Sequence, residues 1–193
     1  MGRTREFDPE IALEEAMRLF WEKGYHDTSV RDLVARTGVS LAGMYGTFGN
    51  KREVFSAALR RYHEQIMGKV LETLEAPDAS LPEITGHFER LYELAKDPRF
   101  RAGCMICNSA VDLAREDPEV ANGFQRNLDR LVAAFRNALA RAKEKGEVRE
   151  DLDPAAAADV LAATQMAMAL FLRAQVGHGR IVQFARHALA TAI

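Results

Sequence analysis

The sequence is short of several features that define other classes of protein. It has two cysteines in 193 residues, too few for a disulfide framework. No segment approaches the roughly 18 uninterrupted apolar residues of a membrane span, and residues 1–10 are polar where a signal peptide would be apolar. The net charge of −2 argues against a DNA-packaging protein without sequence preference. We therefore expect a cytoplasmic protein with no membrane partner.

Catalytic patterns are missing as well. No Ser/His/Asp set, glycine-rich phosphate loop or pair of catalytic carboxylates can be placed on the chain. A dithiol oxidoreductase would use the two cysteines, but the strand–helix–strand context of such enzymes is absent. No strand-like alternation persists, and 48% of the residues are hydrophobic. The sequence therefore predicts an all-α globular protein that is not an enzyme.

Helical periodicity runs along the whole chain. About nine helices are expected, at residues 9–23, 30–36, 41–48, 51–75, 81–96, 103–116, 118–145, 154–176 and 180–193. The fourth is a long amphipathic helix without an internal break. We expect a three-helix head in residues 1–50 and a larger helical domain in residues 51–193.

The most informative stretch lies between Thr28 and Lys51. Thr28 or Ser29 can cap a short helix, Gly38 suits the left-handed conformation just past its end, and Ser40 can cap a second helix. Two helices joined by a short glycine-containing turn are typical of the helix-turn-helix, whose second helix enters the DNA major groove. An ordinary helical hairpin uses the same turn, so the turn alone leaves both interpretations open.

The chemistry around the second helix favours DNA. Its outward surface is small (Ala42, Gly43, Gly46), so a groove wall can approach closely. Lys51, in the first turn of the next helix, opposes the helix dipole, and a bound phosphate would remove that conflict. Six basic residues between Arg31 and Tyr62, against two acidic ones, form a local positive excess: Arg31, Arg36, Lys51, Arg52, Arg60 and Arg61, against Asp32 and Glu53.

Residues 8–60 resemble the N-terminal domain of TetR/AcrR-family transcriptional regulators. The matching segments are Leu19 to Tyr25, Thr28 to Leu33, Gly38-Val39-Ser40, Met44-Tyr45, Phe48 and Asn50-Lys51. The resemblance implies a ligand-responsive regulator, a repressor, that binds a palindromic double-stranded DNA operator as a homodimer. It places these residues at the DNA: Thr28, Arg31, Ser40, Leu41, Ala42, Gly43, Tyr45, Thr47 and Lys51.

Side-chain chemistry divides these contacts. Thr28, Tyr45, Thr47 and Lys51 would hold phosphates. Arg31, Leu41, Ala42 and Gly43 would face base edges, where Arg31 can read a guanine and the apolar residues can contact a thymine methyl group. Thr28 and Ser40 also suit helix caps, and both roles can hold at once. The basic arm at residues 2–5 suits either a minor groove or a disordered terminus.

The later helices carry two further predictions. Apolar residues of the middle helices suit a pocket for an unknown small-molecule effector, but also a plain core: Phe88, Leu91, Tyr92, Met105, Phe124 and Phe135. Residues 155–171 are alanine-rich and apolar on more than one side. By the resemblance, the last two helices form the homodimer interface, whereas their composition alone favours an internal core helix.

Cys104 and Cys107 lie three residues apart on a predicted helix and so share one face. They are within range of a disulfide or of two metal-ligand bonds. One interpretation is a regulator that senses oxidation or a metal through this thiol pair, and the other is a pair of buried small hydrophobic residues. No second cysteine pair or histidine-rich cluster follows to complete a metal site. We expect neither a bound metal nor a cofactor.

Overall fold

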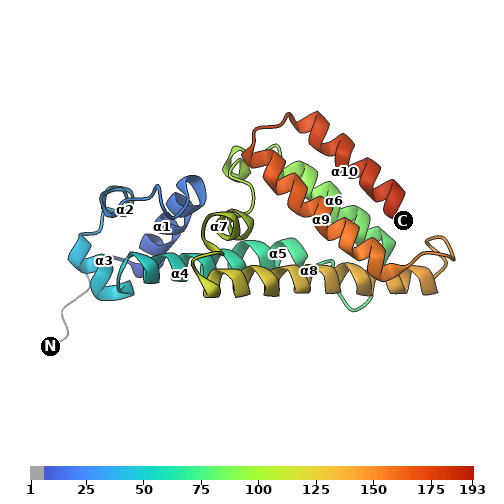
Figure 1. The fold of residues 1–193 in the computed structure, drawn as a ribbon, viewed down its shortest axis with the longest axis horizontal. Helices are drawn as coiled ribbons and strands as arrows, with labels where there is room; N and C mark the ends of the chain where they lie inside the picture. Colours follow the sequence, from blue (N-terminus) through green and yellow to red (C-terminus); the bar gives the residue numbers. More distant parts are fainter. Residues whose placement is uncertain (1–6) are drawn as a thin grey trace. The chain divides into compact units, whose positions relative to one another are not determined.

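The computed structural model describes residues 7–193, and this part of the chain contains helices and no strand. The all-α prediction is therefore confirmed. Two compact units form, of which the first ends at Met67 and the second spans Gly68–Ile193. The functional boundary that the sequence placed at residue 50 stays a prediction. Figure 1 shows the order of the helices along the chain.

Helices and an aromatic core make up the first unit. The elements are α1 (Pro9–Lys23), α2 (Val30–Thr37), α3 (Leu41–Phe48), α4 (Lys51–Tyr62) and the π-helical segment η1 (His63–Met67). α1 packs against α2 and α4. The Phe20 and Phe55 rings meet edge to face with their centroids 5.1 Å apart, and Trp21 meets Tyr62 in the same way at 5.0 Å. These buried pairs give the unit a core of its own.

The second unit is a helical bundle. Its elements are α5 (Gly68–Leu71), α6 (Leu81–Leu94), the 3₁₀ turn η2 (Pro98–Phe100), α7 (Met105–Leu113), α8 (Pro118–Glu144), α9 (Pro154–Arg173) and α10 (His178–Ala192). α9 packs along α8, α10 packs against α9 and α6, and α7 packs on α8 (Figure 1). Aspartate caps followed by proline start both α8 and α9, at Asp117 and Asp153.

The segment predicted as one unbroken helix over residues 51–75 has a different local geometry. Helical residues run from Lys51 to Leu71, but His63–Met67 form a π-helical segment between α4 and α5. A π turn closes its hydrogen bonds one residue later than an α turn. The spacing of apolar residues does not reveal the π-helical segment, because the buried face continues on both sides of it.

α9 has the composition of a core helix. Among the described residues it is the helix that is long and apolar enough to span a bilayer, judged by length and composition alone. In the second unit it buries Ala158, Leu161 and Ala162 against its neighbours. Val160 and Leu170, on the same helix, remain 46% and 59% exposed. An apolar surface is therefore left over after α9 has contributed to the core of its own unit.

Candidate DNA-binding site

Local hydrogen bonds build the turn between α2 and α3. Ser29 Oγ accepts the Asp32 N–H at 3.1 Å, and the Asp32 carboxylate accepts the Ser29 N–H at 2.8 Å, which closes a capping box at the start of α2. Gly38 ends α2 in the left-handed region at φ 69°. Ser40 Oγ then accepts the Gly43 N–H at 3.2 Å and starts α3. The predicted helix, glycine turn and helix all form, and Ser29 rather than Thr28 caps α2.

The surface of α3 is divided between burial and exposure. Met44 is buried, at 1% exposed. Ser40, Leu41, Ala42 and Gly46 are exposed, and Tyr45 and Thr47 are half-buried. The exposed part therefore carries few long side chains, and partly exposed hydroxyl groups lie on the same short helix.

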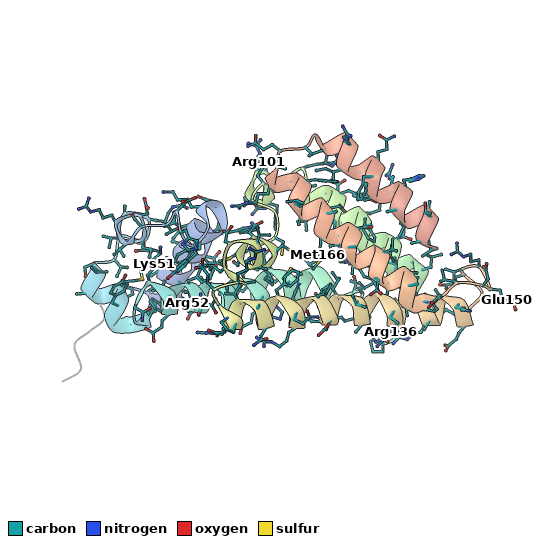
Figure 2. All side chains as sticks on the ribbon, viewed as in Figure 1. Lys51, Arg52, Arg101, Arg136, Glu150 and Met166 are labelled. Carbon is teal, nitrogen blue, oxygen red and sulfur yellow. The ribbon has the colours of Figure 1, made fainter. Side chains whose placement is uncertain are left out.

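A second capping box starts α4 and positions Lys51. Asn50 Oδ1 accepts the backbone N–H groups of Arg52 at 2.9 Å and Glu53 at 3.2 Å. Lys51 Nζ lies 4.3 Å from the centroid of the Tyr25 ring, and Figure 2 labels Lys51 and Arg52 at this helix start. Partial burial lowers the pKa of Lys51, while the charge of Asp32 opposes that shift. A cation is thus held at a helix N-terminus, where backbone N–H groups already favour an anion.

Thr28 is placed differently from the other predicted DNA residues. It is fully buried, and its hydroxyl group donates to the Gly24 carbonyl oxygen at 2.7 Å. The side chain stabilises the turn after α1 and presents no surface to a phosphate. We therefore leave Thr28 out of the proposed contacts.

Packing within the first unit accounts for the glycine at position 43. A Cβ atom there would lie 3.1 Å from Val39 Cγ1 and 3.2 Å from Phe7 Cε1, whereas one at Gly46 would meet nothing within 4 Å. The missing side chain at Gly43 thus makes room for Phe7 and Val39. Any contact of Gly43 with DNA is thereby restricted to its backbone.

The local positive excess is smaller than the residue count indicated. Arg36 pairs with Glu22 and, at 3.6 Å, with Glu15. Arg61 Nε lies 2.8 Å from Glu14 Oε2. Two of the six basic residues therefore bind acidic groups of α1. Of the others, Arg31 and Arg60 are exposed. The basic arm at residues 2–5 lies outside the described residues.

The predicted pocket residues of the second unit are largely core residues. Phe88, Tyr92, Met105 and Phe135 are buried, and Leu91 and Phe124 are half-buried. The Phe88 and Phe135 rings stack with their centroids 5.8 Å apart. Their role in effector binding stays a prediction.

A groove of about 690 Å³ opens elsewhere, between α8 and α9. Figure 2 labels one lining residue on each helix, Arg136 and Met166. Leu128, Val132, Asp159 and Ala163 also line it, and none of these is among the pocket residues predicted from the sequence.

His87 is a further buried polar group that sequence reasoning missed. It is 1% exposed, and its ring nitrogens lie 3.2 Å from the Val70 carbonyl oxygen and 2.7 Å from Gln165 Oε1. Burial lowers the pKa of its imidazole. The available signal was its position three residues after Ile84, on the face of α6 that faces the core.

Cys104 and Cys107 lie within one turn at the start of α7. Cys104 is the N-cap of α7, Cys107 lies in its first turn, and a hydrogen bond joins the two side chains. Within residues 7–193, no group of three or more histidine, cysteine or acidic side chains could hold a metal ion. Sensing through this thiol pair, and its alternative of two small hydrophobic residues, both stay predictions.

A capped helix, a left-handed glycine turn and a second capped helix with an exposed face define a helix-turn-helix DNA-binding protein. Residues 12–58 match the family model described as bacterial regulatory proteins, tetR family. Residues 80–189 match the model for the tetracyclin repressor-like C-terminal domain.

Individual relatives agree over nearly the full length. The uncharacterized HTH-type transcriptional regulator YezE of Bacillus subtilis is 35% identical over 94% of each chain. The HTH-type transcriptional repressor ComR of Escherichia coli is 27% identical over 95% of this chain and 88% of its own. A cysteine mutant of the TetR family regulator CifR, complexed with 26 bp operator DNA, superimposes with a TM-score of 0.83 at 23% identity, over 98% of each chain.

The chain belongs to the TetR family. Members of this family are transcriptional regulators that act as dimers on operator DNA and respond to small-molecule effectors, and this chain is such a regulator. Its relatives are regulators rather than enzymes.

Proposed function

We propose that this regulator is a cytoplasmic repressor whose dimer presents two copies of α3 to the half-sites of a palindromic operator. The observation that carries the proposal is the exposed, small surface of α3 next to the cation at the start of α4. A helix with this surface can approach the edges of the bases closely, while the neighbouring helix start binds a phosphate. Its similarity to the repressor ComR supports repression rather than activation.

The proposed contacts divide by chemistry. Arg31 would donate to a guanine edge, and Leu41 and Ala42 would contact a thymine methyl group. The backbone of Gly43 would lie close to the same bases. Ser40, whose hydroxyl group caps α3, would lie near the DNA backbone. Tyr45 and Thr47 would donate hydroxyl hydrogen bonds to phosphates, and Lys51 would add a charge. Much of the sequence preference would then come from half-site spacing and DNA shape.

Dimerisation would use the apolar surface that α9 and α10 leave exposed. Val160 and Leu170 on α9 and Phe184 on α10 are each more than 40% exposed. Burying such a patch against a second copy removes it from water. An effector bound among the middle helices would favour a subunit arrangement whose α3 helices no longer match the operator, and it shifts this equilibrium only by its differential affinity for the two arrangements.

The test is salt-dependent binding of the full chain to the promoter region of its own gene, measured by fluorescence anisotropy. Replacing Tyr45 by Phe and Lys51 by Ala removes two proposed phosphate contacts, so we expect affinity to fall by about 10–100-fold. Lys96→Ala, which removes an exposed lysine of the second unit, is the matched control and should bind normally. Unchanged affinity in the folded double variant would overturn the proposal.

A further inference from the structure

The two thiols lie at one turn, where a helix begins. Cys104 is the N-cap of the nine-residue helix α7, with extended backbone at φ −98° and ψ 121°, and Cys107 follows in the first turn. The Asn108 N–H donates to the Cys104 carbonyl oxygen at 3.0 Å and closes that turn. Both cysteines are reduced and half-buried, and a hydrogen bond joins their side chains. A pair placed in this way lies within the reach of a disulfide.

The two sulfur atoms have different chemical environments. Cys104 lies at the N-terminus of α7, where the helix dipole favours a thiolate, although its side chain accepts no capping hydrogen bond. The hydrogen bond with Cys104, together with burial, raises the pKa of Cys107 above its ordinary value. Cys107 therefore keeps its proton while Cys104 reacts. We therefore place Cys104 first in the oxidation, with Cys107 as the resolving thiol that loses its proton as it attacks.

We propose that Cys104 and Cys107 form a modification site that a hydroperoxide oxidises to a disulfide, and that this bond weakens operator binding. Cys104 attacks the terminal peroxide oxygen, which breaks the O–O bond, releases an alcohol (water, when the oxidant is hydrogen peroxide) and leaves a sulfenic acid. Cys107 then attacks the Cys104 sulfur and releases water. In total, two thiols and one hydroperoxide give one disulfide, one alcohol and one water, so two electrons pass to the peroxide. The regulatory part rests on the proposed function.

The backbone next to the two cysteines connects this turn to α9, so a disulfide between them would affect more than α7. Gly103 has φ 72°, and a Cβ atom there would lie 2.3 Å from the Ala169 carbonyl oxygen of α9. On the other side of the turn, Asn108 Nδ2 donates to the Ala102 carbonyl oxygen at 2.7 Å. A disulfide brings its sulfurs to about 2.0 Å and fixes the side-chain conformations of both cysteines, which changes how this turn packs on its neighbours. Because Gly103 lies against the backbone of α9, a change of packing at this turn is passed to α9, which carries part of the proposed dimer surface.

The experiment uses the full chain, reduced and kept free of oxygen, and then treated with hydrogen peroxide. Intact mass and maleimide labelling count the thiols, while fluorescence anisotropy measures binding to the operator fragment. Cys104→Ser and Cys107→Ser each remove one partner. Met105→Leu is the matched control for methionine oxidation, because it keeps the volume at a buried site between the cysteines.

We expect the wild type to lose two hydrogen atoms in mass and both maleimide-reactive thiols, and to recover both with dithiothreitol. Operator affinity should fall at least about fivefold on oxidation, in the wild type and in Met105→Leu but in neither serine variant. Thiols that survive peroxide, oxygen added to a single cysteine, or a disulfide without a change in affinity would each overturn the proposal. Failure of the reduced protein to bind the operator would instead overturn the proposed function, since the mass measurement needs no DNA.

Discussion

The two units of this chain differ in how far the residues proposed for function are also residues of the core. In the first unit, the core is made by rings of α1 and α4, among them Phe20 and Phe55, while the proposed contacts occupy the exposed surface of α3. In the second unit, residues selected for a pocket, such as Phe88 and Phe135, are themselves the core. A side chain of the first unit can therefore be changed at the proposed DNA surface without opening the core, whereas a change at the predicted pocket residues of the second unit removes packing.

The largest effect is expected from the second unit. Phe135→Ala deletes a fully buried ring that contacts both His87 and Phe88. We expect the free energy of unfolding to fall by about 3–5 kcal/mol, because the lost burial is joined by the cost of a cavity. Urea denaturation followed by circular dichroism measures it. The exposed neighbour Arg136→Ala should change stability by less than about 0.5 kcal/mol. A cost for Phe135→Ala below about 1 kcal/mol would mean that a cavity already lies beside the ring, in favour of the pocket.

A glycine in the first unit should produce the next largest effect. Gly49 has φ 88°, and a Cβ atom there would lie 1.9 Å from Glu53 Oε2, the carboxylate oxygen that accepts the Asn50 N–H. Gly49→Ala therefore strains the backbone and breaks the capping box of α4, and we expect a loss of about 2–3 kcal/mol. Thermal unfolding checks this. Gly179→Ala, where a Cβ atom meets nothing within 4 Å, is the comparison and should lose no stability. Equal effects at the two glycines would contradict the role of this cap.

Much of the first unit could be predicted because its signals are local. Ser40, Gly38 and Asn50 act within four residues of themselves, so the sequence alone reveals the caps and the turn. Thr28 could not be assigned in this way. Whether its hydroxyl group points to solvent or to the Gly24 carbonyl oxygen depends on how the turn folds back, which no pattern of residue types records.

The second unit was predictable in its helices but not in its cavities. Apolar residues recur at helical spacing along α8, so periodicity alone indicates the buried face that includes Leu131 and Phe135. The groove between α8 and α9 depends on how the facing surfaces of these two helices separate in space. Charged residues such as Asp159 help to line it. A search for apolar residues passes over such positions.

A smaller effect should distinguish two glycines within α3. At Gly46 an added methyl group meets open space, and at Gly43 it presses on Phe7 and Val39. Gly46→Ala should raise the free energy of unfolding by about 0.5–1 kcal/mol through helix propensity. Gly43→Ala should gain less, because Phe7 must move. If DNA lies against α3, Gly46→Ala should also bind the operator several-fold more weakly. A stabilised variant with full affinity would show that this part of α3 does not meet the duplex.

The smallest effect concerns acid stability in the first unit. Hydrogen bonds from the Ser29 hydroxyl and backbone, and then from Lys23, lower the pKa of Asp32 from 3.8 to about 2. Between those two values the unfolded chain binds more protons at this carboxyl group than the folded chain does. Its stabilising contribution is therefore complete above about pH 4 and disappears as the pH falls towards about 2. The side chain is 33% exposed, so solvent screening keeps the contribution small. Urea midpoints at about pH 5 and about pH 2.5 should differ less in Asp32→Asn than in the wild type, and the exposed Asp27→Asn should follow the wild type. If Asp32→Asn and the wild type lose stability in parallel, the carboxylate that closes the first capping box carries no charge-dependent stability, and the caps of this unit act through geometry alone.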